Sequence, residues 1–453
     1  MATTYLTRTL GTPTDSKKWT VAGWIKKASS GSDTTFVQIG STNYTRLNFN
    51  GNGQLEFDNY DGGFDGRRMT SAFYDDPTAW YHIVAVFDSD NGNADDRMIL
   101  YVNGSRITAF GTDSDPTSGA TSGGNTSGEA FEVGRGAGGQ YFNGAMAHVH
   151  LCDGYAYAAS DFGETDSTSG IWVAKTSPSV SYGTNGVFLK FASGATLTDS
   201  SGNGNNMTLG GGTFLHLKDN PDNNFATLNA IQPVSGGFKP QSGATFTNIN
   251  NVFSTNNSSA NWGVGQSTLS FNKGKWYAEC YIQQDTSDDA TVGIRSGRPE
   301  SVADFLGDLA QDYSYYADNG SYYNNNSATS YGDTYATGDY IGIYVDADNQ
   351  KLYFGKNGTI QNSGTGITIS DLTDTDSPFY TMGCSLWSSG TATAIFHWNF
   401  GNGIFGTTAL GGTTYADAGG EGTFKYDPSA GTFDGSSKDF RALCTNNIAT
   451  YGG

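Results

Sequence analysis

The segment from Gly338 to Ile360 reads GDYIGIYVDADNQKLYFGKNGTI and carries the clearest structural signal in the chain. Apolar residues recur from Tyr340 to Val345, an Asp-rich turn follows at 346–349, and a second strand pattern runs from Lys351 to Gly355 before Asn357-Gly358. Asn-Gly is a strong hairpin signal, because a two-residue type I′ turn needs positive φ at both central positions. The segment therefore predicts one β-hairpin that leads into another.

The first half of the chain contains a similar hairpin pattern. Residues Arg97 to Ile107, RMILYVNGSRI, again alternate apolar side chains up to an Asn-Gly pair. In Trp19 to Ile25 the apolar residues share one face, whereas Trp80 to Phe87 is apolar on both faces and is expected to be a central strand. Strand patterns recur at about ten-residue spacing between Gly, Asn, Asp and Ser clusters, which is typical of antiparallel sandwiches. We therefore predict an all-β protein built from two antiparallel β-sandwiches.

Length, composition and charge limit the fold and the kinds of partner that this protein can have. A chain of 453 residues is long for one hydrophobic core, so two domains are expected. Its 63 glycines, 13% aromatic and 15% charged residues are typical of sandwiches rather than helix bundles. The formal net charge of −20 argues against binding to nucleic acid, which requires clustered cations, and against an anionic membrane.

The cysteines and the N-terminus suggest a protein without disulfides or a leader. The four cysteines are widely spaced with no C-x-x-C, so a disulfide framework is not expected, and Cys280 is best explained as a small buried hydrophobe. The opening MATTYLTRTLGT is not a secretory signal, and no apolar stretch is long enough for membrane insertion.

Composition shifts divide the chain into three parts. We expect a first domain at 1–214, a junction at 215–235 and a second domain at 236–453 that ends in a Gly-rich tail. The junction contains NNFATLN between Pro221 and Pro233, and its F-x-x-L spacing returns in DFRALCTNN near the end of the chain. One short helix is expected near 156–162.

Two family resemblances agree with this division. Residues 1 to about 214 resemble the laminin-G-like, concanavalin A-like jelly roll through WYHIVAVFD, ILYVNG and FEVGRG…FNGAMAHVHL. Residues from about 219 onward resemble a SPRY domain through GKWYAECYI, TVGI, GDYIGIYVDADNQKLYFGKNG and IFHWNFG. The pair of domains, with NNFATLN between them and DFRALCTNN at the end, resembles predicted virion surface proteins of tailed marine phages.

This last resemblance implies a non-enzymatic virion structural protein, made in the host cytoplasm without a signal peptide and located on the virion surface. It would be a tail fibre or receptor-binding adhesin that recognises host-surface glycan or protein through loops. A capsid decoration or head-fibre protein is the alternative, and a glycoside hydrolase on the jelly roll is the second alternative. The expected partners are other virion proteins and further copies of the chain, in a homo-oligomer such as a trimer.

The hydrolase alternative depends on the segment QLEFDNYD at 54–61. Concanavalin A-like glucanases carry carboxylates as E-x-D-x-E or E-x-D-x-x-E, and Glu56 and Asp58 would share one strand face. Retaining hydrolysis needs two carboxyl groups about 5 Å apart. Here Tyr60 stands where the short form has its second Glu, and Asp61 where the longer form has Glu. A polar outer strand face explains the pattern equally well, so no catalytic residue is assigned.

Two further patterns suggest metal sites. His148 and His150, at i and i+2, could chelate a metal, but no further ligand follows at a telling spacing, and a surface or interface pair is favoured. Ca²⁺ is the cofactor that the loop DSDNGNADD at 88–96 suggests, because its oxygen ligands are hard and the laminin-G resemblance implies Ca²⁺ in loops. The turn DADN at 346–349 is expected to be structural. The candidate calcium ligands are Asp88, Asp90, Asn91, Asp95 and Asp96.

The segment from Asp312 to Tyr335 is the first candidate for ligand recognition. It is rich in Tyr and Asn, and sugars are bound by aromatic platforms beside amide and carboxylate groups. The SPRY resemblance implies binding through variable loops, although a solvated or intersubunit loop explains the composition as well. A weaker candidate is the loop 59–68. The candidate ligand-binding residues are Tyr315, Tyr316, Tyr322, Tyr323, Asn324, Asn325 and Tyr331 in the first segment, with Tyr60 and Asp61 in the second.

Overall fold

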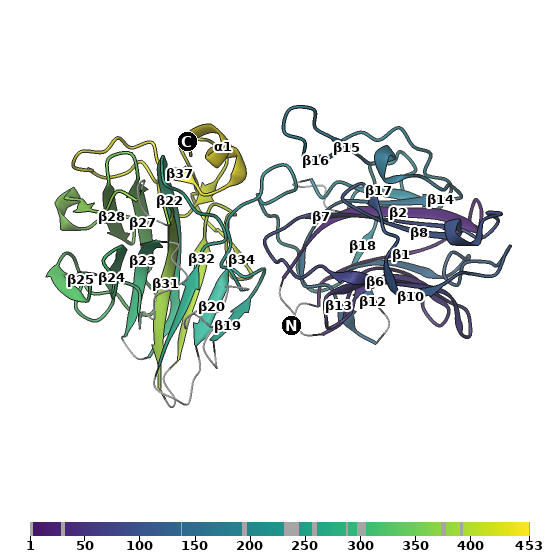
Figure 1. The fold of residues 1–453 in the computed structure, drawn as a ribbon, viewed down its shortest axis with the longest axis horizontal. Helices are drawn as coiled ribbons and strands as arrows, with labels where there is room; N and C mark the ends of the chain where they lie inside the picture. Colours follow the sequence, from purple (N-terminus) through teal and green to yellow (C-terminus); the bar gives the residue numbers. More distant parts are fainter. Residues whose placement is uncertain are drawn as a thin grey trace. The chain divides into compact units, whose positions relative to one another are not determined.

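The computed structural model confirms the predicted all-β fold with antiparallel sheets (Figure 1). It describes residues 3–28, 32–136, 138–192, 197–230, 244–255, 261–286, 289–296, 305–372, 377–389 and 393–452. The chain forms two compact units, Met1–His216 and Leu217–Gly453.

The first domain is a sandwich of two sheets. Its larger sheet has the strand order β10 (Phe110–Ser114), β6 (Phe64–Phe73), β5 (Gln54–Tyr60), β4 (Tyr44–Phe49), β3 (Thr34–Gly40), β11 (Ala130–Val133), β1 (Tyr5–Thr9) and β18 (Thr208–Gly211), with the hairpin β12 (Arg135–Gly136) and β13 (Gln140–Tyr141) beside β3. The second sheet has the order β17 (Val187–Leu189), β14 (Gly144–Asp153), β2 (Lys18–Lys27), β7 (Tyr81–Asp88), β8 (Met98–Val102) and β9 (Ser105–Arg106).

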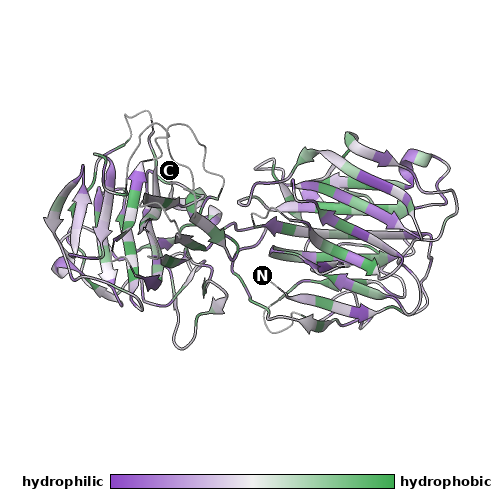
Figure 2. Ribbon diagram, turned by 90° about the horizontal axis from the view of Figure 1, so that it is seen from below, coloured by the Kyte–Doolittle hydropathy of each residue, from purple (hydrophilic) through white to green (hydrophobic). Residues whose placement is uncertain are grey.

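The core of the first domain lies between the two sheets. Hydrophobic and hydrophilic residues alternate along its strands, as Figure 2 shows. Trp19 in β2 stacks on Phe87 of the same sheet at 5.7 Å between ring centroids, and it meets the edge of Phe57 from the other sheet at 5.6 Å. Gly23 in β2 must be glycine, because a Cβ there would lie 2.5 Å from the Phe36 ring. The predicted apolar face of this strand is therefore confirmed.

A third layer covers the outer face of the second sheet. Residues 154–186 form it, with the single-turn 3-10 helix η2 (Ala159–Asp161) and the hairpin β15 (Gly163–Thr165) and β16 (Trp172–Ala174). Phe162 packs against Val84 and Val86 of β7 in a small buried cluster. This layer explains why β7, the predicted central strand, is apolar on both faces. The helix expected at 156–162 amounts to this one 3-10 turn.

The second domain is also a two-sheet sandwich. One sheet has the order β19 (Ala244–Thr247), β20 (Val252–Thr255), β32 (Ala394–Asn399), β22 (Lys275–Asp285), β27 (Tyr340–Asp346), β28 (Lys351–Lys356) and β29 (Thr359–Ile360), with β30 (Ile367–Thr368) on β28 and β37 (Arg441–Ala442) on β22. The other has the order β21 (Asn261–Gln266), β31 (Tyr380–Ser388), β23 (Ala290–Ser296), β24 (Asp312–Tyr316), β25 (Ser321–Asn324) and β26 (Ser327–Ser330).

The hairpin predicted from Gly338–Ile360 is present as β27 and β28, with Asp346 opposite Lys351. Asp346 accepts hydrogen bonds from the backbone and side-chain nitrogens of Asn349 at 3.0 and 2.8 Å, so the Asp-rich turn is structural. Asn357 and Gly358 have φ of 50° and 82°, as an Asn-Gly turn requires. The strongest local signal in the sequence is thus confirmed.

The C-terminal segment is an ordered layer rather than a free tail. Beyond β32 it forms the hairpins β33 (Ile404–Phe405) with β34 (Thr408–Ala409) and β35 (Tyr415–Ala416) with β36 (Thr423–Phe424), and it ends in α1 (Thr445–Tyr451). Its Phe424, Phe433 and Phe440 pack on Tyr277 and Tyr344, which point outward from β22 and β27. The C-terminal segment therefore forms a layer that covers the outer face of this sheet.

Part of the expected junction is built into the second domain. Phe225 is fully buried in the cluster formed by the C-terminal layer, and Ala226 and Leu228 lie in the sandwich core. The contact-based division of the chain falls between His216 and Leu217. The remainder of the junction, at 231–235, and the expected start of the second domain at 236 lie outside the described residues.

Candidate functional site

The outer face of the larger sheet in the first domain is lined with polar side chains. Leu47 in β4 and Phe57 in β5 face the core. Because side chains alternate along a strand, the residues directly before and after each of them face outward. Strand pairing brings these outward residues into register, with Gln38 opposite Arg46 and Arg46 opposite Asp58. We call this set the polar face; it consists of Gln38, Arg46, Asn48, Glu56, Asp58, Arg67 and Glu132.

Asp58 is fully buried between two arginines. Arg46 Nη2 donates to Asp58 Oδ2 at 2.7 Å, and Arg67 Nε lies 3.0 Å from Asp58 Oδ1. The two guanidinium groups come from β4 and β6, on either side of β5. Such pairs satisfy a buried carboxylate, which would otherwise be very unfavourable. Asp58 is therefore held as part of a structural ion-pair network.

Glu56 belongs to the same network. Its Oε1 accepts from Arg67 Nη2 at 3.1 Å and its Oε2 from Asn48 Nδ2 at 3.0 Å. The predicted sharing of one face by Glu56 and Asp58 is thus found, with both carboxylates engaged by neighbouring side chains. Asp61 lies apart from them, exposed beyond the end of β5, where it accepts from Asn43 Nδ2 at 2.6 Å.

Three aromatic residues stand beside the polar face. Tyr44 and Tyr60 are opposite each other on β4 and β5, with stacked rings at 5.2 Å, and Phe64 on β6 packs against Tyr60 at 5.4 Å. Arg46 and Arg67 lie against the rings of Tyr44 and Phe64 at 5.3 and 4.7 Å. Phe64 is 52% exposed, and the two tyrosines are half-buried. We call Tyr44, Tyr60 and Phe64 the aromatic edge.

A pocket of about 340 Å³ adjoins the polar face. Gln38 and Glu132 line it from β3 and β11, and Arg135 and Tyr141 line it from the β12–β13 hairpin. Gly136 allows this hairpin to lie close to the sheet, because a Cβ there would be 2.3 Å from Thr35 Oγ1.

The arginine in the pocket is held by two neighbours. Arg135 Nε donates to Glu132 Oε2 at 2.9 Å, and its Nη2 donates to the other oxygen of the same carboxylate. The guanidinium also lies 3.8 Å from the centre of the Tyr5 ring. The hydrogen bond with Glu132 raises the pKa of Arg135. The side chain is therefore a rigid, charge-paired wall of the pocket.

The pocket and the aromatic edge are neighbours on the sheet. Gly40, which lines the pocket, is opposite Tyr44 in the β3–β4 register. Gln140, on the hairpin beside the pocket, accepts from Arg46 Nη1 at 2.7 Å, which ties the hairpin to the polar face. The polar face, the pocket and the aromatic edge therefore lie side by side on one face of the larger sheet.

The sequence pattern predicted only Tyr60 and Asp61 of this region as ligand-binding residues, in the weaker candidate loop 59–68, which also contains Phe64. Tyr44 and the pocket residues were not predicted. A period-two pattern in Tyr44-x-Arg46-x-Asn48 was the available signal for the polar face. Nothing local indicates that a hairpin near residue 138 would lie beside residue 38.

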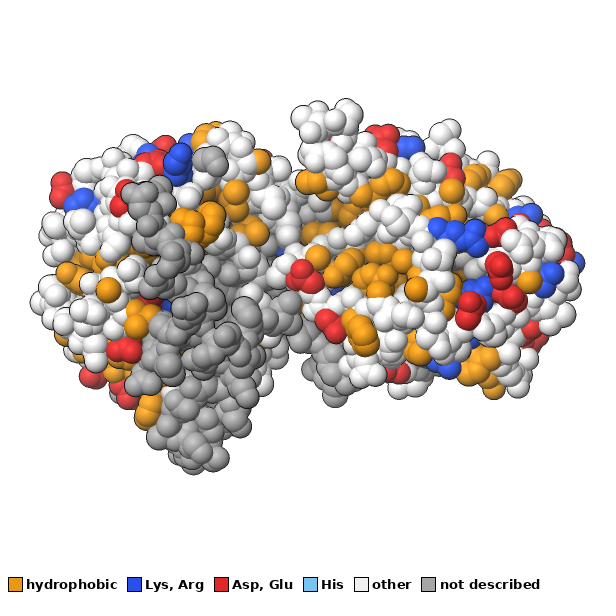
Figure 3. Space-filling view, viewed as in Figure 1, with side chains coloured by type: hydrophobic (Ala, Val, Ile, Leu, Met, Phe, Trp, Pro, Cys, Tyr) orange, Lys and Arg blue, Asp and Glu red, His pale blue; other side chains and the backbone are white. Residues whose placement is uncertain are grey.

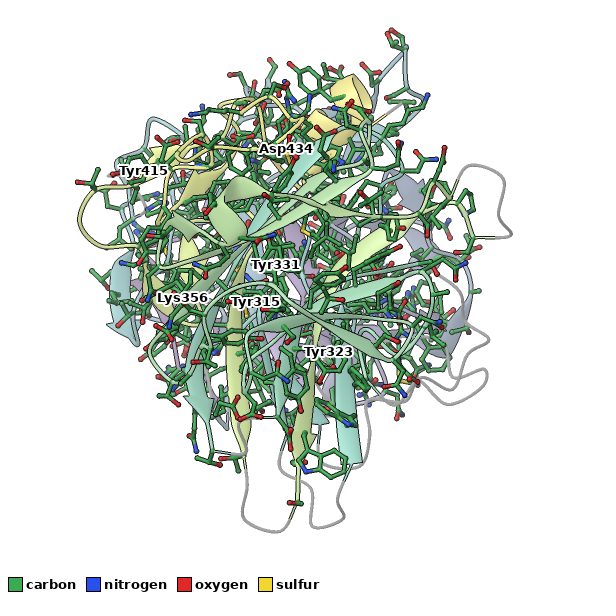
Figure 4. The ribbon with its side chains drawn as sticks, turned by 90° about the vertical axis from the view of Figure 1, so that its left-hand side faces the viewer. Tyr315, Tyr323, Tyr331, Lys356, Tyr415 and Asp434 are labelled. Atoms are coloured by element: carbon green, nitrogen blue, oxygen red, sulfur yellow. The ribbon has the colours of Figure 1, made fainter. Side chains whose placement is uncertain are left out.

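The leading recognition candidate, the Tyr/Asn-rich segment, is mainly strand. Residues 312–330 form β24, β25 and β26, and Tyr315 is fully buried against Phe354. Tyr331 is 5% exposed, and its hydroxyl accepts from the backbone N–H of Phe354 at 3.1 Å. Both tyrosines are labelled among the strands of the second domain in Figure 4. Strand alternation turns these two rings into the core, so their positions do not favour the expectation that they face a ligand.

The other candidates in this segment are partly covered. Tyr316 and Tyr323 pack against each other at 5.0 Å and belong to a half-buried cluster with Trp262 and Phe305. Tyr322 points to the opposite side and packs against the core. The Asn324 side chain donates to the backbone carbonyls of Ala310 and Asp312, whereas Asn325 is exposed in the β25–β26 turn with a φ of 50°. Recognition through a free loop is not the arrangement observed here.

The expected calcium loop is cross-linked by basic side chains. Asp88 pairs with Lys18 and Asp90 with Lys17, both at 3.2 Å, and Asp96 pairs with Arg106 at 2.6 Å. The backbone oxygens of Asn91 and Asp95 accept hydrogen bonds from Arg97 and Arg106. Acidic and basic side chains are intermixed over the face of the first domain seen in Figure 3. These carboxylates are occupied by cations of the chain itself, so their arrangement does not favour the Ca²⁺ expectation.

His148 and His150 both lie on the outer side of β14, where a bulge interrupts the register with β2. His82, which no sequence motif indicated, lies near them, and its Nδ1 accepts a hydrogen bond from Trp172 Nε1 at 3.1 Å. Burial lowers the pKa of His82 to about 3 and that of His150 well below its usual range. His150 is also 3.0 Å from the Tyr182 hydroxyl. Among the described residues, no group of three or more His, Cys, Asp and Glu side chains could hold a metal ion.

Comparison with known proteins finds a similarity to one broad family in each domain. Residues 2–160 match the family model described as the concanavalin A-like lectin/glucanases superfamily, and residues 251–396 match the SPRY domain model. The chain is 28% identical over 96 residues, 21% of its length, to the dual specificity protein kinase splA of Dictyostelium discoideum, of which it spans only 4%.

Similar solved structures include the SPRY domain of human HERC1, with 21% identity, coverage of 36% of this chain and 96% of that one, and a TM-score of 0.29. A heptameric SAP-like pentraxin from Limulus polyphemus shows 15% identity, coverage of 39% and 87%, and a TM-score of 0.28. The two family matches support a concanavalin A-like domain followed by a SPRY domain. Within the described part of the chain, no helix is long and apolar enough to cross a membrane.

Proposed function

We propose that this protein is a non-enzymatic adhesin that binds a glycan on a host surface through the first domain. The observation that carries the proposal is that the aromatic edge and the pocket lie on the same face of the sheet, together with the side chains of the polar face. Sugars present apolar C–H faces to aromatic rings and hydroxyl groups to amides, carboxylates and guanidinium groups. Both kinds of group occur together on this face.

We propose binding rather than hydrolysis because of the network around Glu56 and Asp58. A glycoside hydrolase needs one carboxyl group that acts on the leaving group and a second one that attacks or activates water. Here the carboxylates are bonded to Arg46, Arg67 and Asn48. These interactions favour a rigid polar surface over proton transfer to a substrate.

The proposed setting is the surface of a tailed phage virion, with this protein as a tail fibre or receptor-binding part. The support is the order of the two domains and the NNFATLN and DFRALCTNN segments, which resemble phage virion proteins. A capsid decoration or head-fibre protein is the alternative within the same setting. A symmetric oligomer, such as a trimer, would add avidity to weak single sites.

The binding proposal can be tested with purified full-length protein on a glycan array and on host cells. Tyr60→Ala and Phe64→Ala should weaken binding at least about tenfold, because each removes ring surface from the aromatic edge. Phe73→Ala is the matched control, since Phe73 is 61% exposed at the far end of the same strand, β6. Equal loss in all three variants, or no loss in the first two, would contradict the proposed site.

The virion setting has its own test. Immunogold electron microscopy of intact particles should place the protein at a tail tip or fibre. A regular lattice of label over the capsid would instead support the decoration alternative. Release of reducing sugar from a bound glycan, abolished by Glu56→Gln, would replace the adhesin proposal with the hydrolase.

A further inference from the structure

The charged groups of the candidate site neutralise one another. In the polar face, Asp58 and Glu56 are matched by Arg46 and Arg67. In the pocket, Glu132 is matched by Arg135. Each of these three arginines donates to a carboxylate from its own surroundings, so none of them presents its full charge to a ligand.

An anionic ligand would have to compete with these carboxylates. The side chains of Asp58, Glu56 and Glu132 are 0%, 7% and 9% exposed, so a carboxylate that loses its arginine would remain buried without its partner. Breaking a buried ion pair in this way is strongly unfavourable. The arginines are therefore poor receptors for a sulfate or carboxylate on a sugar.

The rim of the site carries further negative charge. Glu129 accepts a hydrogen bond from the hydroxyl of Ser41, which lines the pocket, and Asp33 accepts from the amide of Gln140. Asp61 follows the aromatic residue Tyr60 directly and accepts from the amide of Asn43. Asp33 and Asp61 are exposed and Glu129 is half-buried, and the interactions described for these three carboxylates are with neutral groups. The whole chain has a formal net charge of −20. A negatively charged sugar would be repelled at the rim before it reached the pocket.

The site is long enough for more than one sugar unit. The pocket lies at β3 and β11, and the aromatic edge extends across β4, β5 and β6. Adjacent strands are about 4.8 Å apart, so the distance from β3 to β6 is about 14 Å. A chain that crosses the strands can place one unit in the pocket and others against the aromatic edge.

From these observations we infer that the ligand is an uncharged oligosaccharide, and that sulfated, sialylated and uronic acid glycans are rejected. The inference rests on the proposed function and specifies its ligand class. Hydroxyl groups can share hydrogen bonds with a paired carboxylate or guanidinium without separating the pair. Recognition then depends on shape, ring contact and hydroxyl positions.

The test uses matched pairs of polysaccharides that differ only in charge. One pair is a sulfated galactan and its desulfated form, and a second is a uronic acid polymer and its carboxyl-reduced form, measured with the full-length protein by biolayer interferometry. The uncharged member of at least one pair should bind at least about tenfold more tightly than its acidic partner. Its binding should change little between 50 and 500 mM salt (about a tenfold range), because no counterions are displaced.

A variant test separates rim repulsion from other causes. Glu129→Gln combined with Asp33→Asn should improve the binding of the acidic member at low salt and leave that of the uncharged member nearly unchanged. Asp222→Asn combined with Asp318→Asn, at two exposed carboxylates of the second domain, is a charge-matched control and should alter neither. Oligosaccharides should also bind more tightly than the monosaccharide.

The outcomes distinguish the two proposals. Tighter binding of the acidic members, or no response of their binding to the rim variant, would overturn the inference and leave an adhesin with a different ligand class. Preference for a cationic amino sugar over its N-acetylated form would likewise overturn it. Absence of binding to both members of every pair, together with absence of binding to host cells, would overturn the adhesin proposal as well.

Discussion

Phe225 forms an antiparallel bridge with Cys444, so the segment that enters the second domain pairs with the segment that ends it. The backbone N–H of Ala226 donates to the Leu443 carbonyl at 2.9 Å. The two F-x-x-L segments, 225–228 and 440–443, also place their Phe and Leu side chains in the same two layers of the second domain. Phe225 and Phe440 lie in the outer aromatic cluster, and Leu228 and Leu443 lie in the sandwich core. The short sequence echo therefore corresponds to two segments that together close one domain.

This closure predicts that the C-terminal layer is required for the stability of the second domain. Phe440→Ala should lower its free energy of unfolding by about 3–5 kcal/mol, since the ring is fully buried and the change leaves a cavity. Urea unfolding followed by hydrogen exchange would assign the loss to residues 217–453. Tyr415→Ala, at a residue 38% exposed in the same layer, is the control and should change stability little. A small effect of Phe440→Ala would show that the layer is only loosely attached.

The second domain should become less stable as pH rises from about 4.5 to 7. Burial raises the pKa of Glu279 from 4.5 to about 7, although Lys425 N, Tyr426 N, Asn399 Nδ2 and the Tyr277 hydroxyl all donate to it. Between pH 4.5 and about 7 the native state binds more protons than the unfolded state, so the free energy of unfolding falls as pH rises. Above this range Glu279 is ionised in both states and contributes no further change. The change amounts to on the order of 3 kcal/mol.

Glu279→Gln should remove most of this pH dependence, because the amide does not ionise. The measurement is the urea midpoint of the second domain as the pH is raised from about 4.5 to about 8, which spans the ordinary and the raised pKa of Glu279. An unchanged slope in the variant would assign the dependence to another group.

The first domain should show the opposite trend. Burial lowers the pKa of His82 to about 3 from 6.5, so between these values the unfolded state binds more protons than the native state. Stability is then present above pH 6.5 and is lost as pH falls toward 3. The nearby His148 disfavours a charge on His82, and His150 is affected in the same direction.

His82→Gln should reduce this acid sensitivity while it keeps an acceptor for Trp172 Nε1. Hydrogen exchange of residues 1–216 at pH 7 and pH 5 would measure the effect. Equal acid sensitivity in the variant and the wild type would contradict a role for His82.

Asp58 is predicted to stabilise the first domain. Asp58→Asn leaves Arg46 and Arg67 with a neutral partner, so the free energy of unfolding should fall by about 3 kcal/mol or more. Glycan binding by the folded fraction should weaken only modestly. Asp113→Asn is a milder control, since it also pairs with an arginine but its side chain is 58% exposed. Full stability of Asp58→Asn would argue that the buried network contributes little.

Local patterns predicted much of the fold but less of the candidate site. The Gly338–Ile360 hairpin and the central strand at 80–87 were predictable, because alternation and Asn-Gly turns act over a few residues. Tyr315 shows why composition alone is not sufficient to predict the site. A segment rich in Tyr and Asn is typical of a loop, but here it pairs with neighbouring strands, and alternation then places every second ring in the core. The alternation of Tyr313 and Tyr315 was the signal that could have corrected this.

The amino-acid pattern alone determined that this chain forms two antiparallel sandwiches and that Glu56 and Asp58 share a strand face, because strand periodicity is a property of neighbouring residues. Only the tertiary structure decided which groups meet on that face. Arg46 and Arg67 arrive from adjacent strands, and the pocket is completed by a hairpin about a hundred residues away from Gln38 in the chain. Register and sheet order create these contacts, and they are set by packing across the whole domain rather than by any single segment.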